Sequence, residues 1–419
     1  MIHSIEALSY RCLKYVKQRL GSFHLLVGPN GSGKSTFLDV ISFLADLLMQ
    51  GPDFAVEERA SSGNRVDELV WKRETSRFEL ALNLRIPDQL PRLNRQHTIC
   101  RYEVAIGISE QESGASLLAE SLVLMGEEEL PVREQRSLFP IEPVPPTSIL
   151  LGAQPQRRRS RTILKKIESS SNDYFKSEMT NWNLQFRFGP SKTALANLPE
   201  DPTKFPIATW AKTALMGGIQ TIALDIRRMR EPSPKRSGRY LWPNGSNLAS
   251  VVHRLRNRSP KLFEEWVSHV RTILPDLKAI NTRDRPEDRH VYLTLAYENG
   301  VRVPSWLVSD GTLRMLALTA LPYIKPHDDI YLIEEPENGV HPRAVEGVFQ
   351  SLSSVYDAQV LVATHSPVLL RLAKPEQVLC FGRTPGGATD VISGSEHPRL
   401  KDWQGEVEIG DLFAAGVLG

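Results

Sequence analysis

The chain has 419 residues, of which 41% are hydrophobic and 24% are charged, and its mean hydropathy is −0.27. This composition indicates a globular protein of two or three domains, and it excludes a fibre, a disordered tail protein and a membrane protein. No apolar run approaches 18 residues and no secretory signal begins the chain, so we expect no membrane partner. Cys12, Cys100 and Cys380 fit neither a disulfide framework nor a zinc site, which favours a reducing cytoplasm.

The formal net charge of +2 hides an uneven distribution along the chain. Residues 151–300 carry 26 Lys and Arg against 14 Asp and Glu, whereas the rest of the chain carries 25 and 35. A basic middle suits contact with nucleic-acid phosphates or with an acidic protein partner. A solvated face without a partner is an equally good interpretation.

In chain order, the first elements are a strand-rich start and the short apolar run Phe23–Val27, which ends in a glycine-rich turn. A helix follows, with apolar residues at a 3.6-residue period from Phe37 to Leu48, and Gly51-Pro52 should end it. The next stretches predict an antiparallel sheet of strands 77–86, 98–108 and 117–125.

The segment Pro131–Ser160 is rich in proline and contains Arg157, Arg158 and Arg159, so we interpret it as a loop or linker that leads into an inserted region. Helical patterns follow at 209–216 and 248–274, and a strand at 290–297. From Ser309 to about Cys380, helices alternate with strands, as in the parallel half of an α/β domain.

The strongest motif is a full G-x-x-x-x-G-K-[ST] between a predicted strand and a predicted helix. It is made of Gly28, Pro29, Asn30, Gly31, Ser32, Gly33, Lys34, Ser35 and Thr36. Small residues let the backbone wrap a phosphate chain, and the helix N-terminus supplies amide donors. Lys34 should reach the β- and γ-phosphates of a nucleotide, and Ser35 should ligate Mg²⁺.

Two further apolar strands end in residues suited to phosphate chemistry. Ile330–Ile333 is followed by Glu334, which would hold Mg²⁺ through water, and by Glu335, which would polarise an attacking water. Val360–Ala363 is followed by His365, which could hydrogen-bond a γ-phosphate.

A fourth motif is Ser309, Asp310, Gly311 and Thr312 before the helical stretch 313–320. A helix N-terminus there is a candidate anion site. Taken alone, a serine N-cap without any ligand is the better interpretation.

Together these motifs resemble the ATP-binding-cassette (ABC) ATPases. Residues 28–36 look like Walker A, 330–335 like Walker B, His365 like the switch histidine, and 309–312 like the signature loop. The stretches 335–342, 225–232 and 244–249 are similar to the RecF/SMC-like and OLD-like branch of AAA family ATPases, of the kind found in bacterial anti-phage defence. The signature reads Ser-Asp-Gly-Thr and Glu334 replaces the usual Asp, as in that branch. Gln50 and Gln89 are weak candidates for the Q-loop glutamine.

The resemblance covers 1–125 and about 208 to the C-terminus, and it implies an α/β fold. We expect an ABC-ATPase head with a P-loop parallel sheet core, an antiparallel β-subdomain, a helical lobe and an inserted basic region. The expected divisions are the N-terminal part of the head at 1–130, the insertion at 131–207, the helical lobe at 208–289 and the C-terminal part of the head at 290–419.

The resemblance also implies the chemistry: binding and hydrolysis of ATP with Mg²⁺, with Lys34, Glu335 and His365 as catalytic residues. ATP would clamp copies of the chain into a homodimer or a higher oligomer, in which Ser309 of one copy meets the nucleotide held by another.

Family association suggests a switch for a separately encoded effector, a nuclease, in anti-phage defence. Only 54 residues follow His365, too few for the Toprim nuclease domain of OLD-type proteins. The alternative is a RecF/SMC-like repair or recombination ATPase that holds DNA through the basic middle. A nucleotide-binding subunit of a membrane transporter fits poorly, because the span between Walker A and the signature is long and the signature lacks glutamine.

Overall fold

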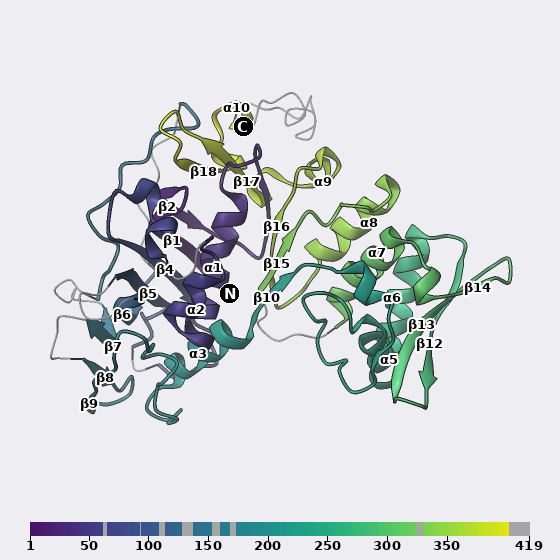
Figure 1. Cartoon of the computed structure of the whole chain (residues 1–419), viewed down its shortest axis with the longest axis horizontal. Helices are drawn as coiled ribbons and strands as arrows, with labels where there is room; N and C mark the ends of the chain where they lie inside the picture. The colour runs from purple at the N-terminus through teal and green to yellow at the C-terminus, as the bar shows by residue number, and fades with distance from the viewer. Residues whose placement is uncertain are drawn as a thin grey trace.

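The computed structural model describes residues 1–61, 65–92, 94–108, 114–127, 137–152, 160–167, 173–324 and 330–401. Figure 1 shows a larger lobe that contains the first strands and helix α1, and a smaller lobe that contains helices α5 and α6 and strands β12–β14. Strands β10, β15 and β16 lie between the labelled elements of the two lobes.

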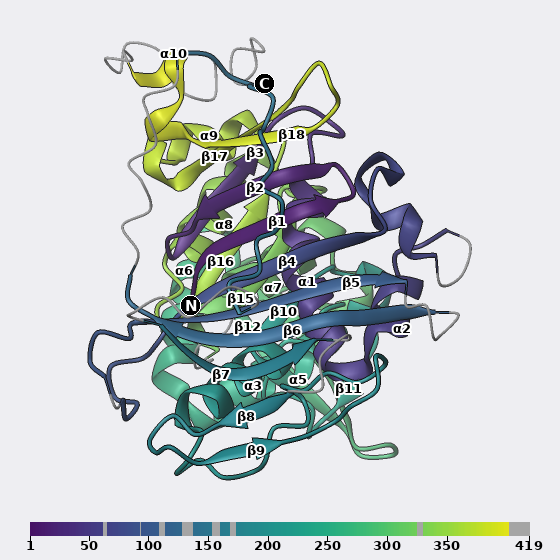
Figure 2. The same ribbon diagram turned by 90° about the vertical axis from the view of Figure 1, so that its left-hand side faces the viewer.

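The larger lobe is built on an eight-stranded sheet whose described neighbours all pair antiparallel, in the order β2-β1-β4-β5-β6-β7-β8-β9 (Figure 2). Its strands are β1 (Ile2–Tyr10), β2 (Leu13–Arg19), β4 (Arg77–Arg85), β5 (Ile99–Ile108), β6 (Ala115–Met125), β7 (Arg161–Ile167), β8 (Tyr174–Lys176) and β9 (Asn183–Gln185). The three strands predicted between residues 77 and 125 are therefore confirmed.

The central sheet has the order β10-β15-β16-β3-β17-β18, and every pair in it is parallel except the last. Its strands are β10 (Ile219–Ile222), β15 (Ile330–Glu334), β16 (Gln359–Ala363), β3 (Phe23–Val27), β17 (Val378–Arg383) and β18 (Thr389–Ser393). The predicted parallel α/β half is confirmed.

Two hydrophobic cores pack against opposite faces of this central sheet. Alternate residues of β15 enter different cores, Ile330 and Leu332 the first and Tyr331 and Ile333 the second. This division follows from the two-residue period of a strand, and it explains why the strand reads as an unbroken apolar run.

The first core also receives α1 (Lys34–Gln50), α2 (Pro52–Glu57) and α3 (Pro206–Gly217). Helix α1 ends as predicted, because Gly51 takes φ 91° and donates its N–H to the Leu47 carbonyl. Pro52 then begins α2, where its missing N–H leaves no helical hydrogen bond unmade.

The second core receives most of the remaining helices, which are α5 (Leu248–Arg258), α6 (Pro260–Ile273), α7 (Asp310–Ala320), α8 (Pro342–Ser353) and α9 (Pro367–Leu372). The pattern predicted at 248–274 forms two helices rather than one, because Pro260 cannot continue the hydrogen-bond ladder of α5. Short helices are α4 (Ile226–Met229) and α10 (Pro398–Lys401). Within the described ranges, none of the helices is long and apolar enough to cross a membrane.

Short 3-10 helices connect several of these elements. They are η1 (Val66–Leu69), η2 (Trp71–Arg73), η3 (Ser305–Leu307), η4 (Leu321–Tyr323), η5 (Pro375–Gln377) and η6 (Gly394–Glu396).

The smaller lobe carries a third sheet, in which β13 (His290–Tyr297) pairs antiparallel with β12 (Leu277–Arg285), β11 (Ser233–Pro234) and β14 (Arg302–Pro304). The buried face of β13, formed by Val291, Leu293 and Leu295, belongs to the second core. The strand predicted at 290–297 is therefore confirmed.

The middle of the chain is shared between the lobes. Strands β7–β9, which follow the Pro-rich stretch, extend the antiparallel sheet of the larger lobe, and α3 packs in the first core. The described residues 137–152 form no helix or strand, as predicted for a loop, whereas Arg157–Arg159 lie outside the described residues. The expected divisions at 131, 208 and 290 stay predictions.

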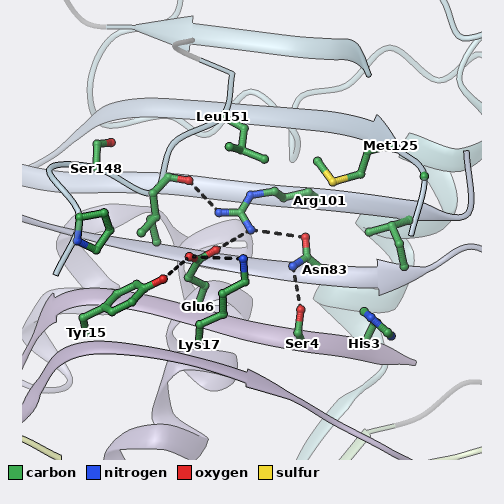
Figure 3. Close-up of a pocket in the computed structure, with 14 residues that line it drawn as sticks. His3, Ser4, Glu6, Tyr15, Lys17, Asn83, Arg101, Met125, Ser148 and Leu151 are labelled. Atoms are coloured by element: carbon green, nitrogen blue, oxygen red, sulfur yellow. Dashed lines mark hydrogen bonds and ion pairs between the residues drawn. The ribbon is translucent and has the colours of Figure 1, made fainter. Parts of the chain in front are cut away.

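A buried ion network holds this loop on the antiparallel sheet (Figure 3). Arg101 is 2% exposed and donates to Glu6 at 2.8 Å, to Glu103 at 2.6 Å and to the Ile149 carbonyl at 2.7 Å. Glu103 in turn accepts from the main-chain N–H of Gly152 at 2.7 Å. Every charge in the network has a partner, which is the condition for burying it without a large desolvation penalty.

We predict that Arg101→Ala lowers the free energy of unfolding by about 3–5 kcal/mol, because it takes the arginine away from the buried Glu103 carboxylate and leaves Glu6 with the more distant Lys17, at 4.0 Å. Urea denaturation measures the change. The matched control is Arg85→Ala, which removes an arginine 52% exposed in its side chain and paired with Glu127. The control should cost less than about 1 kcal/mol. Equal losses in the two variants would contradict the assigned role of the network.

Candidate functional site

The glycine-rich turn after β3 forms a tight loop that only glycine allows at two positions. Gly28 has φ 149° and Gly33 has φ 101°, in the region that favours glycine. A Cβ atom on Gly28 would lie 2.2 Å from the Phe381 carbonyl oxygen, and one on Gly33 would lie 2.3 Å from the Thr389 hydroxyl. The loop is therefore pressed against β17 and β18, with its free side toward the cavity described below.

Lys34 is the first residue of α1, and its ammonium group points back to the glycine-rich loop that precedes the helix. Its Nζ donates to the carbonyls of Gly28 at 2.9 Å and Pro29 at 3.0 Å. Burial lowers the pKa of Lys34, and the charges of Glu334 and Glu335 oppose that shift. A cation in this position can still offer one proton to a ligand in the loop.

The glycine-rich loop contains a buried polar group without a hydrogen-bond partner among the described residues. Ser32 is 1% exposed, and its hydroxyl has no hydrogen-bond partner among the residues that the structure describes. An orphaned buried hydroxyl, glycines without room for a side chain and a lysine at the helix start together fit a phosphate chain.

Two carboxylates stand at the end of strand β15, which β16 separates from β3. Glu334 accepts a hydrogen bond from the Ser35 hydroxyl at 2.9 Å. A hydroxyl beside a carboxylate is an oxygen donor pair that Mg²⁺ prefers, so these two residues fit the predicted metal role. The backbone of Glu335 takes φ 46°, and its N–H donates to the Ala363 carbonyl at 2.8 Å. The Glu335 carboxylate accepts a hydrogen bond from the Asn338 side chain.

His365 follows β16, the strand between β15 and β3. It shares one cavity of about 400 Å³ with the phosphate loop and the two carboxylates. The residues that line this cavity are Arg11, Cys12, Asn30, Gly31, Gly33, Lys34, Ser35, Thr36, Glu334, Glu335, Ala363 and His365. Three segments predicted separately from the sequence thus meet at one edge of the central sheet.

The predicted signature residues lie elsewhere. Ser309 is the N-cap of α7, as its sequence pattern predicts, and its hydroxyl accepts from the Thr312 N–H. Arg230 fixes this loop by donating to the Val308 carbonyl at 3.0 Å and to Asp310. Ser309, Asp310 and Gly311 do not line the cavity that holds Lys34 of the same chain.

Sequence reasoning missed several residues of the site. Arg11 and Cys12 come from the turn between β1 and β2, and Arg11 is held by Asp39 and by the Arg59 carbonyl. No local motif marks them, because their place depends on how the two sheets meet. Gln50 and Gln89, the weak Q-loop candidates, are exposed and do not line the cavity.

The chain is similar in fold to a solved Smc head. The Smc head bound to the C-winged helix domain of ScpA matches with a TM-score of 0.54 and 15% identity, covering 94% of this chain and 97% of that chain. The Smc head with an extended coiled coil, from Pyrococcus furiosus, gives 0.49 at 14% identity over 94% and 96%. The SMC head domain from Thermotoga maritima gives 0.42 at 10% identity over 94% and 98%.

No curated protein sequence matches the chain. A family model described as "AAA domain, putative AbiEii toxin, Type IV TA system" matches residues 23–115 and 243–371, which together exceed half of the chain. The matched ranges contain the phosphate loop, the signature loop, both carboxylates of β15 and His365. The chain therefore belongs to this family of AAA domains, and it has the fold of an SMC-type ABC-ATPase head.

Proposed function

We propose that the chain binds ATP in the cavity between Lys34, Glu335 and His365 and hydrolyses it to ADP and phosphate. The observation that carries this proposal is the meeting of these three side chains in one cavity. Lys34 faces the β- and γ-phosphates, and the loop amides supply further donors. Mg²⁺, held by Ser35 and Glu334, would neutralise phosphate charge when bound.

In this proposal Glu335 takes the proton of the attacking water. Its carboxylate stands at the cavity wall, and the hydrogen bond from Asn338 fixes one of its oxygens. A base within reach of the water and a histidine beside the γ-phosphate are the groups that phosphoryl transfer to water requires.

The signature loop supports the second part of the proposal, which is ATP-dependent homodimerisation. Ser309 and its helix N-terminus are exposed and lie outside the cavity of their own chain. In the ABC family the corresponding loop closes over the nucleotide of a second copy, so a site of this chain would be complete only in the dimer. Isologous contact in a two-fold dimer builds two such sites.

The biological role we propose is a switch for a separately encoded effector in bacterial anti-phage defence. The matched family's description names a toxin of a type IV TA system, which supports a role in a system of more than one component. Dimer formation on ATP and release after hydrolysis would give that effector two states to distinguish.

A second candidate is a DNA-holding ATPase of the RecF/SMC-like kind, and the exposed arginines of the basic middle favour it. They lie on α4, on the loop after β11 and on α5: Arg227, Arg228, Arg236, Arg239, Arg254, Arg256 and Arg258. Exposed arginines suit contact with nucleic-acid phosphates.

We predict that Glu335→Gln retains ATP binding but hydrolyses ATP about 10²–10⁴-fold more slowly, since it removes the general base. Lys34→Ala should lose ATP binding itself. Isothermal titration and phosphate release separate the two effects, with the exposed Glu346→Ala as control. Turnover within twofold of wild type in Lys34→Ala would rule out the nucleotide site, and unchanged turnover in Glu335→Gln would place the base elsewhere.

We also predict that two inactive variants restore activity when they are mixed. Ser309→Arg blocks closure over the partner's nucleotide, and Lys34→Ala removes the chain's own phosphate contact. Random exchange makes half the dimers mixed, each with one intact composite site, so about one quarter of all sites recover. Phosphate release after mixing differently tagged chains measures this. Full activity of Ser309→Arg alone would refute the composite site.

For the DNA alternative, we predict that Arg254→Ala with Arg258→Ala weakens duplex DNA binding. The slope of log K against log[salt] should fall by about 0.9 for each DNA phosphate that the variant no longer neutralises. Fluorescence anisotropy over a salt series measures both quantities, and Arg85→Ala with Arg95→Ala, two exposed arginines of the larger lobe, is the matched control. A wild-type protein that binds no DNA at low salt would exclude this candidate.

A further inference from the structure

Glu337, two residues after the proposed base, makes the contacts that fix the loop carrying His365. Its Oε1 accepts from the Thr364 hydroxyl at 2.5 Å and from the His365 main-chain N–H at 3.2 Å. Thr364 is fully buried, and its hydroxyl oxygen also accepts from the Ser366 N–H at 3.0 Å. The only proton of that hydroxyl is thus committed to Glu337.

Glu337 itself stands behind the site rather than in it. The cavity is lined by Glu334, Glu335 and His365, but not by Glu337. Its second oxygen, Oε2, is buried without a hydrogen-bond partner in the described part of the chain. Glu337 is therefore placed to act through His365 and not on a water or phosphate in the cavity.

The turn that carries Glu337 also touches the signature loop of the same chain. The Val340 N–H donates to the Glu337 carbonyl at 3.0 Å, which closes the turn. In the same turn, the Gly339 carbonyl oxygen packs against Gly311 of the signature loop. A Cβ atom on Gly311 would lie only 2.2 Å from that oxygen. The turn that carries Glu337 thus contacts both the loop that carries His365 and the signature loop.

We propose that Glu337 is a positioning residue. Its carboxylate sets the place of His365 in the nucleotide cavity, and its turn ties that place to the position of the signature loop in the same chain. This inference rests on the ATPase function proposed above. When the signature loop of one chain closes over the partner's nucleotide, His365 of that same chain would then change its position in the chain's own cavity.

The test compares Glu337→Ala with Glu337→Gln, which keeps an oxygen acceptor for Thr364 and His365 but removes the negative charge. A positioning role predicts that kcat falls about 10- to 100-fold in Glu337→Ala, as misplaced reacting groups do, while ATP affinity stays within twofold. Glu337→Gln should keep kcat within about threefold of wild type. Glu346→Ala on the exposed face of α8 is the matched control and should not differ from wild type.

A second readout does not depend on turnover. The imidazole Cε1–H resonance of His365, assigned with a His365→Gln variant, should shift in Glu337→Ala and keep its place in Glu337→Gln and Glu346→Ala. Should Glu337→Ala not fold, Thr364→Val removes the same hydrogen bond from the other side and should shift the same resonance.

Three results would overturn the proposal. The first is a kcat for Glu337→Gln as low as that of Glu335→Gln. The second is a wild-type kcat for Glu337→Ala, and the third is a His365 resonance that does not shift in Glu337→Ala. If the wild-type protein hydrolyses no ATP but the resonance shifts as expected, the positioning contact stands and the proposed ATPase function fails.

Discussion

Parallel pairing of β15, β16 and β3 is the constraint on which the site depends. Glu334 lies opposite Ala363, and Ala363 lies opposite Leu26, so the three strands end level with one another. Each strand is then followed by its polar turn at the same edge of the sheet. The pairing is stabilised by apolar side chains buried on both faces, which means that burial of residues such as Leu332 and Val362 fixes the geometry of Lys34, Glu335 and His365.

The residues of the site that could be predicted are those whose chemistry is local. Gly28–Thr36 combines a strand end, a phosphate loop and a helix start within one stretch. Glu334 and Glu335 directly follow one apolar run, and His365 follows another after a single residue. The parallel half of the fold was predictable for the same reason, because its strands are uniformly apolar and alternate with helices. The contacts between segments, such as that of Glu337 with Thr364, depend on the tertiary arrangement and carry no sequence signal.

The eight-stranded sheet shows why strand β7 could not be predicted from the sequence. In β7, Lys166 is 2% exposed, and its ammonium donates to the carbonyls of Gly189 and Lys192. Buried charges that are satisfied by distant backbone break the alternation of apolar and polar residues by which a strand is recognised. A strand such as β7 therefore reads as part of a polar insertion.

The backbone of Glu335 has a consequence for any attempt to stabilise this protein. A residue with a Cβ atom in the left-handed region, here at φ 46°, carries a local conformational cost of about 1 kcal/mol or more. Glycine at this position would relieve that cost and would remove the carboxylate from the cavity wall. Selection for thermal stability alone would thus favour chains that have lost their proposed base, so a library built for robustness should hold Glu335 fixed or be screened for turnover at the same time.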